Sequence, residues 1–185
     1  FRLASVSKQF CTMVMMQLVQ EGRVSLDDKI TDYLPYYRKD TGDRVSLHHL
    51  MCHQSGLKDF TAGFDYRGTV SKLSFDKDEF ITLHCSGDLV NEPGTIYSYC
   101  NAGYCILGRI IEKVTGKTFE RNLHDRIFDP LGMKNSGYDR NRYVIEKRAA
   151  GYTRGPFGFE NADYMDMGSS PGAAGSLYST VEDMF

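Results

Sequence analysis

Hydrophobic residues concentrate in two segments of the chain that predict long helices. From Phe10 to Val19, apolar side chains fall on every face of a helical wheel, which is typical of a helix inside a protein. From Asn101 to Thr115 they recur at helical spacing. Gly22 and Gly116 follow the two segments and supply helix stops. We therefore expect two buried helices, the first with neighbours on all sides.

Weaker patterns predict shorter helices and long loops around these two segments. Gly103 and Gly108 lower the helix propensity of the second segment, so we expect a close helix contact there as compensation. Shorter helices are predicted from Ser25 to before Pro35, Ser46 to His53, Asp76 to Cys85, Thr118 to Phe128 and Ser179 to Phe185. Loops are predicted over 36–44, 61–74 and 135–175.

A polar quartet, Ser5 to Lys8, stands directly before the first long helix. Residues three apart share one face of a helix, so the Ser5 hydroxyl and the Lys8 amine should lie side by side. The amides and the positive dipole end at this terminus favour negative charge nearby. Nucleophile, amine and anion-stabilising backbone would then meet at one point. The alternative is that Ser5 is a plain helix cap.

Spacing of the Ser-x-x-Lys kind is weak evidence when it stands alone, because it also begins at Ser55 and Ser74. Ser55 has a glycine beside it, and Ser74 precedes a polar helix. Ser5 heads a buried helix, where removal of water favours a neutral amine that can act as a base. The sequence therefore favours Ser5 over the other two serines.

A second polar motif precedes the second long helix. Tyr99 and Asn101 lie at a turn that leads into that helix, as Ser5 does for the first. A phenol can pass protons in a suitably charged site, and a carboxamide can hydrogen-bond an amide-bearing substrate. Taken singly, Tyr99 could be an interfacial aromatic and Asn101 an N-cap. Two polar motifs that each head an apolar helix indicate one shared cleft.

Composition excludes several other functions. The chain has 185 residues, 41% of them hydrophobic, which is enough for the packed core of one domain. A net charge of −2 argues against nucleic acid as the main partner, and the basic, aromatic stretch 140–154 is interpreted as a solvated loop. No apolar run reaches about 18 residues, so we expect no membrane span.

Metal and disulfide chemistry have little support in the sequence. His49 and His53 are four residues apart, but no glutamate follows His49 to complete the zinc motif His-Glu-x-x-His. We expect no metal and no cofactor. The number of cysteines is odd and their spacing is not that of a metal site, so we interpret them as mostly buried free thiols (Cys11, Cys52, Cys85, Cys100, Cys105).

Several collinear motifs give the chain a resemblance to a known family. The matching stretches are 1–8 (FRLASVSK), 50–57 (LMCHQSGL), 92–94 (EPG), 99–101 (YCN), 107–116 (LGRIIEKVTG), 130–133 (PLGM) and 173–180 (AAGSLYST). The chain resembles the serine β-lactamase and penicillin-binding family, in the branch with class C β-lactamases, D-Ala-D-Ala carboxypeptidases and related esterases. The matches span nearly the whole chain.

The resemblance implies a function and a role for each candidate residue. It implies a serine acyl-transfer hydrolase that acts on amide, β-lactam or ester bonds through an acyl-serine intermediate. Ser5 would be the nucleophile, Lys8 its activating amine, Tyr99 a proton-transfer partner and Asn101 a substrate ligand. The substrate would be a β-lactam, a D-Ala-D-Ala peptide or an ester. His53 falls where the family has a structural histidine.

One departure from the family pattern qualifies these expectations. The family's third motif, Lys-Thr-Gly or His-x-Gly on an edge strand, is absent; Gly116-Lys-Thr118 has the wrong order. In the family, that strand provides half of the oxyanion hole, and losing one such donor typically costs ~10²–10³ in rate. The alternative function is therefore a catalytically silent relative or fragment with a binding or structural role.

The resemblance also implies a fold and a cellular location. It implies an α/β (α+β) β-lactamase/transpeptidase-like fold, of which residues 1–185 would be mostly the helical lobe, with the sheet largely missing and the domain truncated at both ends. We expect little turnover from these residues alone, and self-association through the uncovered lobe face. Family resemblance implies a periplasmic or secreted protein, whereas unpaired cysteines leave the cytoplasm open.

Overall fold

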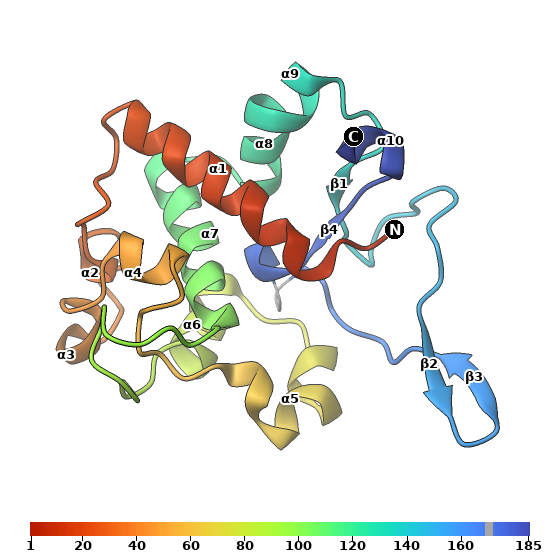
Figure 1. Cartoon of the computed structure of the whole chain (residues 1–185), viewed down its shortest axis with the longest axis horizontal. Coiled ribbons are helices and arrows are strands. Elements are labelled where there is room, and N and C mark those ends of the chain that lie inside the picture. The colour runs from red at the N-terminus through yellow and green to blue at the C-terminus, as the bar shows by residue number, and fades with distance from the viewer. Residues whose placement is uncertain (169–171) are drawn as a thin grey trace.

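The two segments predicted as long helices form the centre of the fold (Figure 1). The structure is a computed structural model and describes residues 1–168 and 172–185. Helix α1 (Ser7–Gln20) packs against helix α7 (Asn101–Thr115). Both follow the sequence prediction closely, and Gly116, with a φ of 70°, ends α7 as expected.

Helix α7 forms the central element of the core because its apolar side chains point in several directions. Ile106, Leu107, Ile110 and Ile111 are all fully buried. Around α7 pack α1 and several shorter helices: α2 (Ile30–Tyr33), α4 (Leu47–Met51), α6 (Lys77–His84) and α8 (Phe119–Leu123). A helix covered on this many sides holds a fixed orientation, which matters because the site begins at its first residue.

The two glycines inside α7 mark close approaches, as predicted. A Cβ added at Gly103 would lie 3.4 Å from Leu50 Cδ2 in α4. A Cβ added at Gly108 would lie only 2.6 Å from the Cβ of Ala173, in the 3₁₀ turn Gly172–Ala174. The first contact is with a helix, whereas the second is with a turn near the end of the chain. Glycine at position 108 thus allows that turn to pack directly on α7.

Strands make up little of the described chain, which confirms the expected helical lobe with little sheet. β1 (Gly137–Tyr138) pairs antiparallel with β4 (Leu177–Tyr178), and Arg2 forms a further bridge to Tyr178. β2 (Tyr152–Gly155) and β3 (Gly158–Asn161) form a hairpin that projects away from the helices (Figure 1). The predicted loop over 135–175 therefore contains strands.

The neighbours of α1 among the described residues cover only part of its surface, in line with the expected uncovered lobe face. Phe10, Val14 and Leu18 face the core and are 8% exposed or less. Met13 is 53% exposed and Met16 is 41% exposed, because α7 and α8 approach α1 from the opposite side. One face of α1 is therefore apolar and uncovered within residues 1–168 and 172–185.

The helix predicted to begin near Ser25 begins later. The Asp28 carboxylate accepts the Ser25 backbone N–H at 2.6 Å, and the Asp28 N–H donates to the Ser25 carbonyl. These bonds close a turn, so α2 starts at Ile30. Two segments predicted as loops also contain short helices, α3 (Lys39–Gly42) and α5 (Phe64–Gly68).

The predicted helix from Thr118 to Phe128 does not stop at Asp129-Pro130. Thr118 caps α8, a π-helical turn follows over His124–Phe128, and α9 (Asp129–Leu131) continues to Gly132. Pro130 lies in α9 directly after the π-helical turn. The predicted helices at Ser46, Asp76 and Ser179 are confirmed in type, with caps at Ser46, Asp76 and Thr180 (α10, Val181–Met184).

Candidate active site

Ser5 lies in a single 3₁₀ turn, Ala4–Val6, that leads into α1. The backbone of Leu177 in β4 holds this turn on both sides. The Leu3 N–H donates to the Leu177 carbonyl at 2.8 Å, and the Leu177 N–H donates to the Ser7 hydroxyl at 3.1 Å. Ala4 has a φ of 46°, a conformation uncommon for a residue with a side chain. The strand-to-helix junction thus presents Ser5 in a fixed and exposed position.

Lys8 lies beside Ser5, as the spacing of three residues predicts. Its Nζ is 3.2 Å from the Ser5 Oγ, 2.8 Å from the Asn101 Oδ1 and 2.7 Å from the Ala174 carbonyl oxygen. An ammonium has three donors, and these three acceptors match them. Lys8 is 6% exposed, so its amine is held in place away from bulk water.

Tyr99 reaches the same serine from a distant part of the chain. Its hydroxyl is 2.6 Å from the Ser5 Oγ, and the Lys8 Nζ lies 4.8 Å from the centre of its ring. Tyr99 is 41% exposed, so its hydroxyl can be reached from the solvent side. The structure therefore brings all four candidate residues together, with Ser5 Oγ between an amine and a phenol.

His53 shapes the backbone that carries Tyr99. Its Nδ1 accepts the Cys100 N–H at 3.1 Å, and its carbonyl accepts the Ser98 N–H at 2.8 Å. Its ring centre lies 4.5 Å from that of Tyr99. Burial, followed by the charge of Lys8, lowers the pKa of His53 and favours the neutral ring that this hydrogen bond requires. His53 is thus a structural support of the site.

Two partners of the site could not be identified from sequence reasoning. The Ala174 carbonyl that binds Lys8 is a backbone group and carries no side-chain signal. Asp59 accepts hydrogen bonds from the backbone and side chain of Asn101. In the sequence, Asp59 directly follows Ser55-Gly-Leu-Lys58 and lies between two of the matching stretches. This position alone does not indicate a role in the site; the contact with Asn101 in the structure does.

A cleft of about 860 Å³ opens at Ser5. Its walls come from the Ser5 turn, the start of α7, the β2–β3 hairpin and the segment that follows the hairpin. Lining residues include Thr61, Asn101, Tyr152, Glu160, Asp163 and Gly175. A cleft of this size holds a ligand of drug size. A carbonyl compound bound there would meet the Ser5 hydroxyl with two proton-carrying groups beside it.

The residues considered as alternative sites in the sequence make structural contacts instead. Ser55 is buried, and its hydroxyl accepts the Leu57 N–H. The Nδ1 of His49 accepts the Ser46 N–H, just as the Nδ1 of His53 accepts a backbone amide. Within the described residues, no three His, Cys, Asp or Glu side chains gather as metal ligands would. Arg140 and Arg148 pair with acidic side chains, which accounts for part of the basic stretch 140–154.

The cysteines follow the sequence interpretation. Cys52 is exposed and the other four are buried thiols. Cys100 stands between Tyr99 and Asn101 and is 1% exposed, so it points away from the cleft. Burial raises its pKa to about 11. No disulfide is present among the described residues, and no helix among them is long and apolar enough to cross a membrane.

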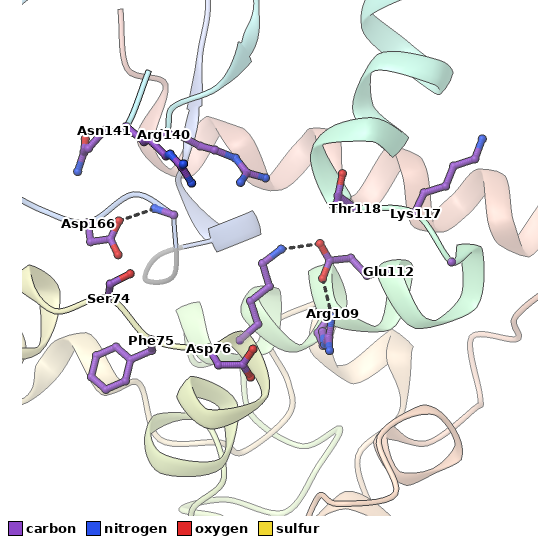
Figure 2. A pocket seen from close by; sticks show the side chains of 14 residues that line it. Ser74, Phe75, Asp76, Arg109, Glu112, Lys117, Thr118, Arg140, Asn141 and Asp166 are labelled. Atoms are coloured by element: carbon purple, nitrogen blue, oxygen red, sulfur yellow. Dashed lines mark hydrogen bonds and ion pairs between the residues drawn. The ribbon is translucent and has the colours of Figure 1, made fainter. Parts of the chain in front are cut away.

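A second cavity of about 610 Å³ is lined mainly by charged side chains (Figure 2). Glu112 of α7 lies at its edge and is 8% exposed. Its carboxylate accepts hydrogen bonds from Lys77 of α6 at 2.5 Å, from Arg109 at 3.0 Å and from the Phe119 N–H of α8 at 2.8 Å. These bonds join three helices, so we interpret this network as structural support for the core.

Comparison with known proteins supports the resemblance seen in the motifs. The family described as Beta-lactamase matches residues 1–185. Penicillin-binding protein 4 of Amycolatopsis lactamdurans is 34% identical over 140 residues, 74% of this chain and 35% of that protein. Teichoic acid D-alanine hydrolase of Staphylococcus aureus is 26% identical over 186 residues, 100% of this chain and 44% of that protein. The chain spans less than half the length of either relative.

A solved structure shows the same architecture. D-amino acid amidase from Ochrobactrum anthropi SV3 superimposes on 100% of this chain and 52% of its own, with a TM-score of 0.85 and 33% identity. The β-lactamase/transpeptidase-like fold predicted from the sequence is thereby confirmed for the part that this chain represents. Family match, fold and the convergence at Ser5 agree, and the chain belongs to the Beta-lactamase family.

Proposed function

We propose that this chain carries the nucleophile and proton-transfer groups of a serine acyl-transfer hydrolase acting on amide, β-lactam or ester bonds. One observation carries the proposal: the Lys8 Nζ and the Tyr99 hydroxyl both lie within hydrogen-bond distance of the Ser5 Oγ. A nucleophile held against an adjacent base, with that base oriented by further groups, is the arrangement that nucleophilic catalysis needs.

The proposed reaction has two stages. Ser5 Oγ attacks the substrate carbonyl carbon while its proton passes to the amine of Lys8, which must be unprotonated to accept it. The pair of Lys8 and Tyr99 returns a proton to the leaving amine or alcohol, which leaves an acyl-Ser5 ester. Water then attacks that ester, gives up a proton to the same groups, and releases the acid and free Ser5. Asn101 holds Lys8 through its Oδ1 and lies at the cleft wall beside the bound substrate.

We further propose that the acyl group carries a free amine, as in D-aminoacyl esters and amides. The names of two similar proteins, a D-alanine hydrolase and a D-amino acid amidase, support this substrate class. The cleft supports it too, because Glu160 and Asp163 are among the residues that line it and would attract an ammonium group. β-Lactams remain useful probes, because they acylate a serine of this kind through the same first stage.

Covalent labelling of the intact protein tests the proposal. A fluorescent penicillin or a fluorophosphonate should label the wild type, and mass spectrometry should place the adduct on Ser5. Ser5→Ala should abolish labelling yet keep the fold, since the Ser5 side chain is exposed and caps no helix. Ser74→Ala, which removes an exposed serine that also has a lysine three residues on, is the matched control and should label normally. Labelling that survives Ser5→Ala would overturn the assignment.

A further inference from the structure

Asp59 holds Asn101 at two separate points. One carboxylate oxygen, Oδ1, accepts the backbone N–H of Asn101 at 3.1 Å. The other, Oδ2, accepts the side-chain Nδ2 of Asn101 at 3.1 Å, and the Thr61 hydroxyl lies 3.3 Å from the same nitrogen. Asp59 comes from the segment between α4 and α5, whereas Asn101 is the first residue of α7. A carboxylate at the start of a long helix is favourable, because the helix dipole is positive there.

These contacts decide which way the Asn101 carboxamide points. A carboxamide has a donor end and an acceptor end that differ little in shape. An ionised carboxylate only accepts, so it draws the Nδ2 donor toward itself. The Oδ1 acceptor is then left facing Lys8, whose Nζ lies 2.8 Å away. The opposite orientation would set two donors, Nδ2 and Nζ, against each other.

We propose that Asp59 is a positioning residue that acts on the nucleophile through Asn101 and Lys8. The contacts run in one line: Asp59 orients Asn101, Asn101 orients Lys8, and Lys8 lies 3.2 Å from the Ser5 Oγ. Asp59 itself need not touch the substrate. This inference rests on the proposed role of Lys8, and it adds a residue that none of the sequence motifs contains.

The line of contacts predicts a specific coupling between variants. Asp59→Ala should lower the second-order rate constant for acylation by about 10²-fold, the size expected when a catalytic group is displaced by about 1 Å. In an Asn101→Ala background, Asp59→Ala should have almost no further effect, because the group through which it acts is gone. Asp59→Asn keeps one acceptor for Asn101 and should lose less activity than Asp59→Ala.

Asp76→Ala serves as the matched control. Asp76 is also a carboxylate at a helix start, where it accepts the N–H groups of Asp78 and Glu79 at the beginning of α6. It should change acylation by less than twofold. If the losses from Asp59→Ala and Asn101→Ala instead multiply independently, or if Asp76→Ala lowers acylation as much as Asp59→Ala, the proposal is overturned.

A readout without activity separates this proposal from the proposed function. In protein with ¹³C-labelled lysine, the ε-methylene resonance of Lys8 can be assigned by its loss in Lys8→Met. Asp59→Ala should shift the chemical shift of this resonance and the midpoint of its pH titration in the same direction as Asn101→Ala does. If the wild type is not labelled at Ser5, the proposed function fails while this measurement still tests Asp59. If Asp59→Ala fails to fold, Asp59→Asn takes its place, and an unchanged Lys8 resonance in a folded Asp59 variant refutes the inference.

Discussion

At the scale of single residues, the two proton-carrying groups beside Ser5 differ in how firmly they are held. Lys8 is 6% exposed and has three acceptors around its amine, so it has little freedom to move. Tyr99 is 41% exposed and is supported mainly by ring contact with His53. The phenol is therefore the group better placed to exchange a proton with a leaving group or with water.

Tyr99→Phe tests directly whether the phenol of Tyr99 transfers a proton. The change removes the hydroxyl that lies 2.6 Å from the Ser5 Oγ but keeps the ring against His53. We expect the rate of covalent labelling at Ser5 to fall by ~10²–10⁴, the usual contribution of a positioned acid or base. The melting temperature should hardly change. Tyr97→Phe, whose ring also packs on His53 at 5.8 Å, is the control and should keep the wild-type labelling rate; similar losses in both variants would contradict a specific role for Tyr99.

At the scale of secondary structure, the site depends on how closely the Gly172–Ala174 turn packs on α7. That turn carries the Ala174 carbonyl, one of the acceptors of Lys8. Gly108 lies beneath it, and an added Cβ would lie 2.6 Å from the Ala173 Cβ. Neither group can swing aside, because each Cβ is attached directly to its backbone. Any side chain at position 108 must therefore displace the turn.

We predict opposite outcomes for two Gly→Ala changes in α7. Alanine gains about 1 kcal/mol of helix propensity over glycine, whereas overpacking costs about 1–3 kcal/mol. For Gly108→Ala the overpacking should prevail, so that both the free energy of unfolding and acylation decrease. For Gly103→Ala the added Cβ would meet the flexible Leu50 side chain at 3.4 Å, so stability should be unchanged or higher. Urea unfolding measures the stability of each variant, and the rate of covalent labelling measures its acylation. If Gly108→Ala and Gly103→Ala changed stability equally, the packing argument would be contradicted.

Another link between elements joins α6 to α7 through an ion pair. Arg109 Nε and Nη2 each lie 2.6 Å from the Asp78 carboxylate, and the Tyr36 hydroxyl donates to it at 2.7 Å. The hydrogen bond from Arg109 is the main reason that the pKa of Asp78 lies well below its usual range. Below pH 4 the unfolded state therefore binds more protons at this position than the folded state.

The sign of this shift predicts the pH dependence of an Asp78→Asn variant. The ion pair contributes stability above the unfolded pKa of about 3.9, and that stability is lost as the pH falls through the lower folded pKa. Asp78→Asn should thus unfold more easily than wild type at pH 7, and the difference should shrink below pH 4. Asp88→Asn, which breaks a surface pair of Arg38 with an 89% exposed carboxylate, should have little effect at either pH. A constant difference across this range would contradict the assignment.

At the scale of the whole molecule, three histidines respond to pH in the same direction. Burial is the largest cause of a lowered pKa at His49, His53 and His84. An unfolded histidine has a pKa of about 6.5, so below that pH the unfolded state takes up protons before the folded state does. Stability should therefore rise with pH between about 5 and 7.

Chemical unfolding at several pH values measures this dependence. We expect the urea midpoint to fall steadily from pH 7.5 to pH 5.5. His84→Gln replaces an imidazole packed against Phe75 and Phe80 by a neutral amide. This change should reduce the dependence of the urea midpoint on pH. A midpoint that stays constant over this range, or a slope unaffected by the substitution, would show that burial of these rings does not govern the stability.

The uncovered apolar face of α1 also belongs to this scale. Met13 and Met16 of α1, and Val6 directly before the helix, are each more than 40% exposed on the described chain. Soluble proteins rarely leave a large apolar patch open to water. Self-association through this face stays a prediction, and sedimentation of the purified protein at several concentrations tests it.

Much of the local structure could be predicted because it depends on neighbouring residues. Apolar spacing located α1, α6 and α7, and caps such as Asp76 and stops such as Gly116 set their ends. The pairing of Ser5 with Lys8 could be predicted for the same reason, since residues three apart share a face. The short helices α3 and α5 could not, because segments of four or five residues carry too little periodicity.

The sequence by itself determined which residues form the long helices and which polar residues precede them. The sequence also indicated one shared cleft for Ser5 and Tyr99, but only the tertiary structure decided that the Tyr99 hydroxyl, 94 positions away, lies 2.6 Å from the Ser5 Oγ, and that Ala174 and Asp59 hold the groups around it. Such contacts depend on how helices pack across long stretches of chain, and spacing along the sequence does not record this. The uncovered face of α1 shows the same limit: the apolar pattern on all its sides indicated that one face would lack neighbours, but only the arrangement of α7 and α8 shows which side they cover.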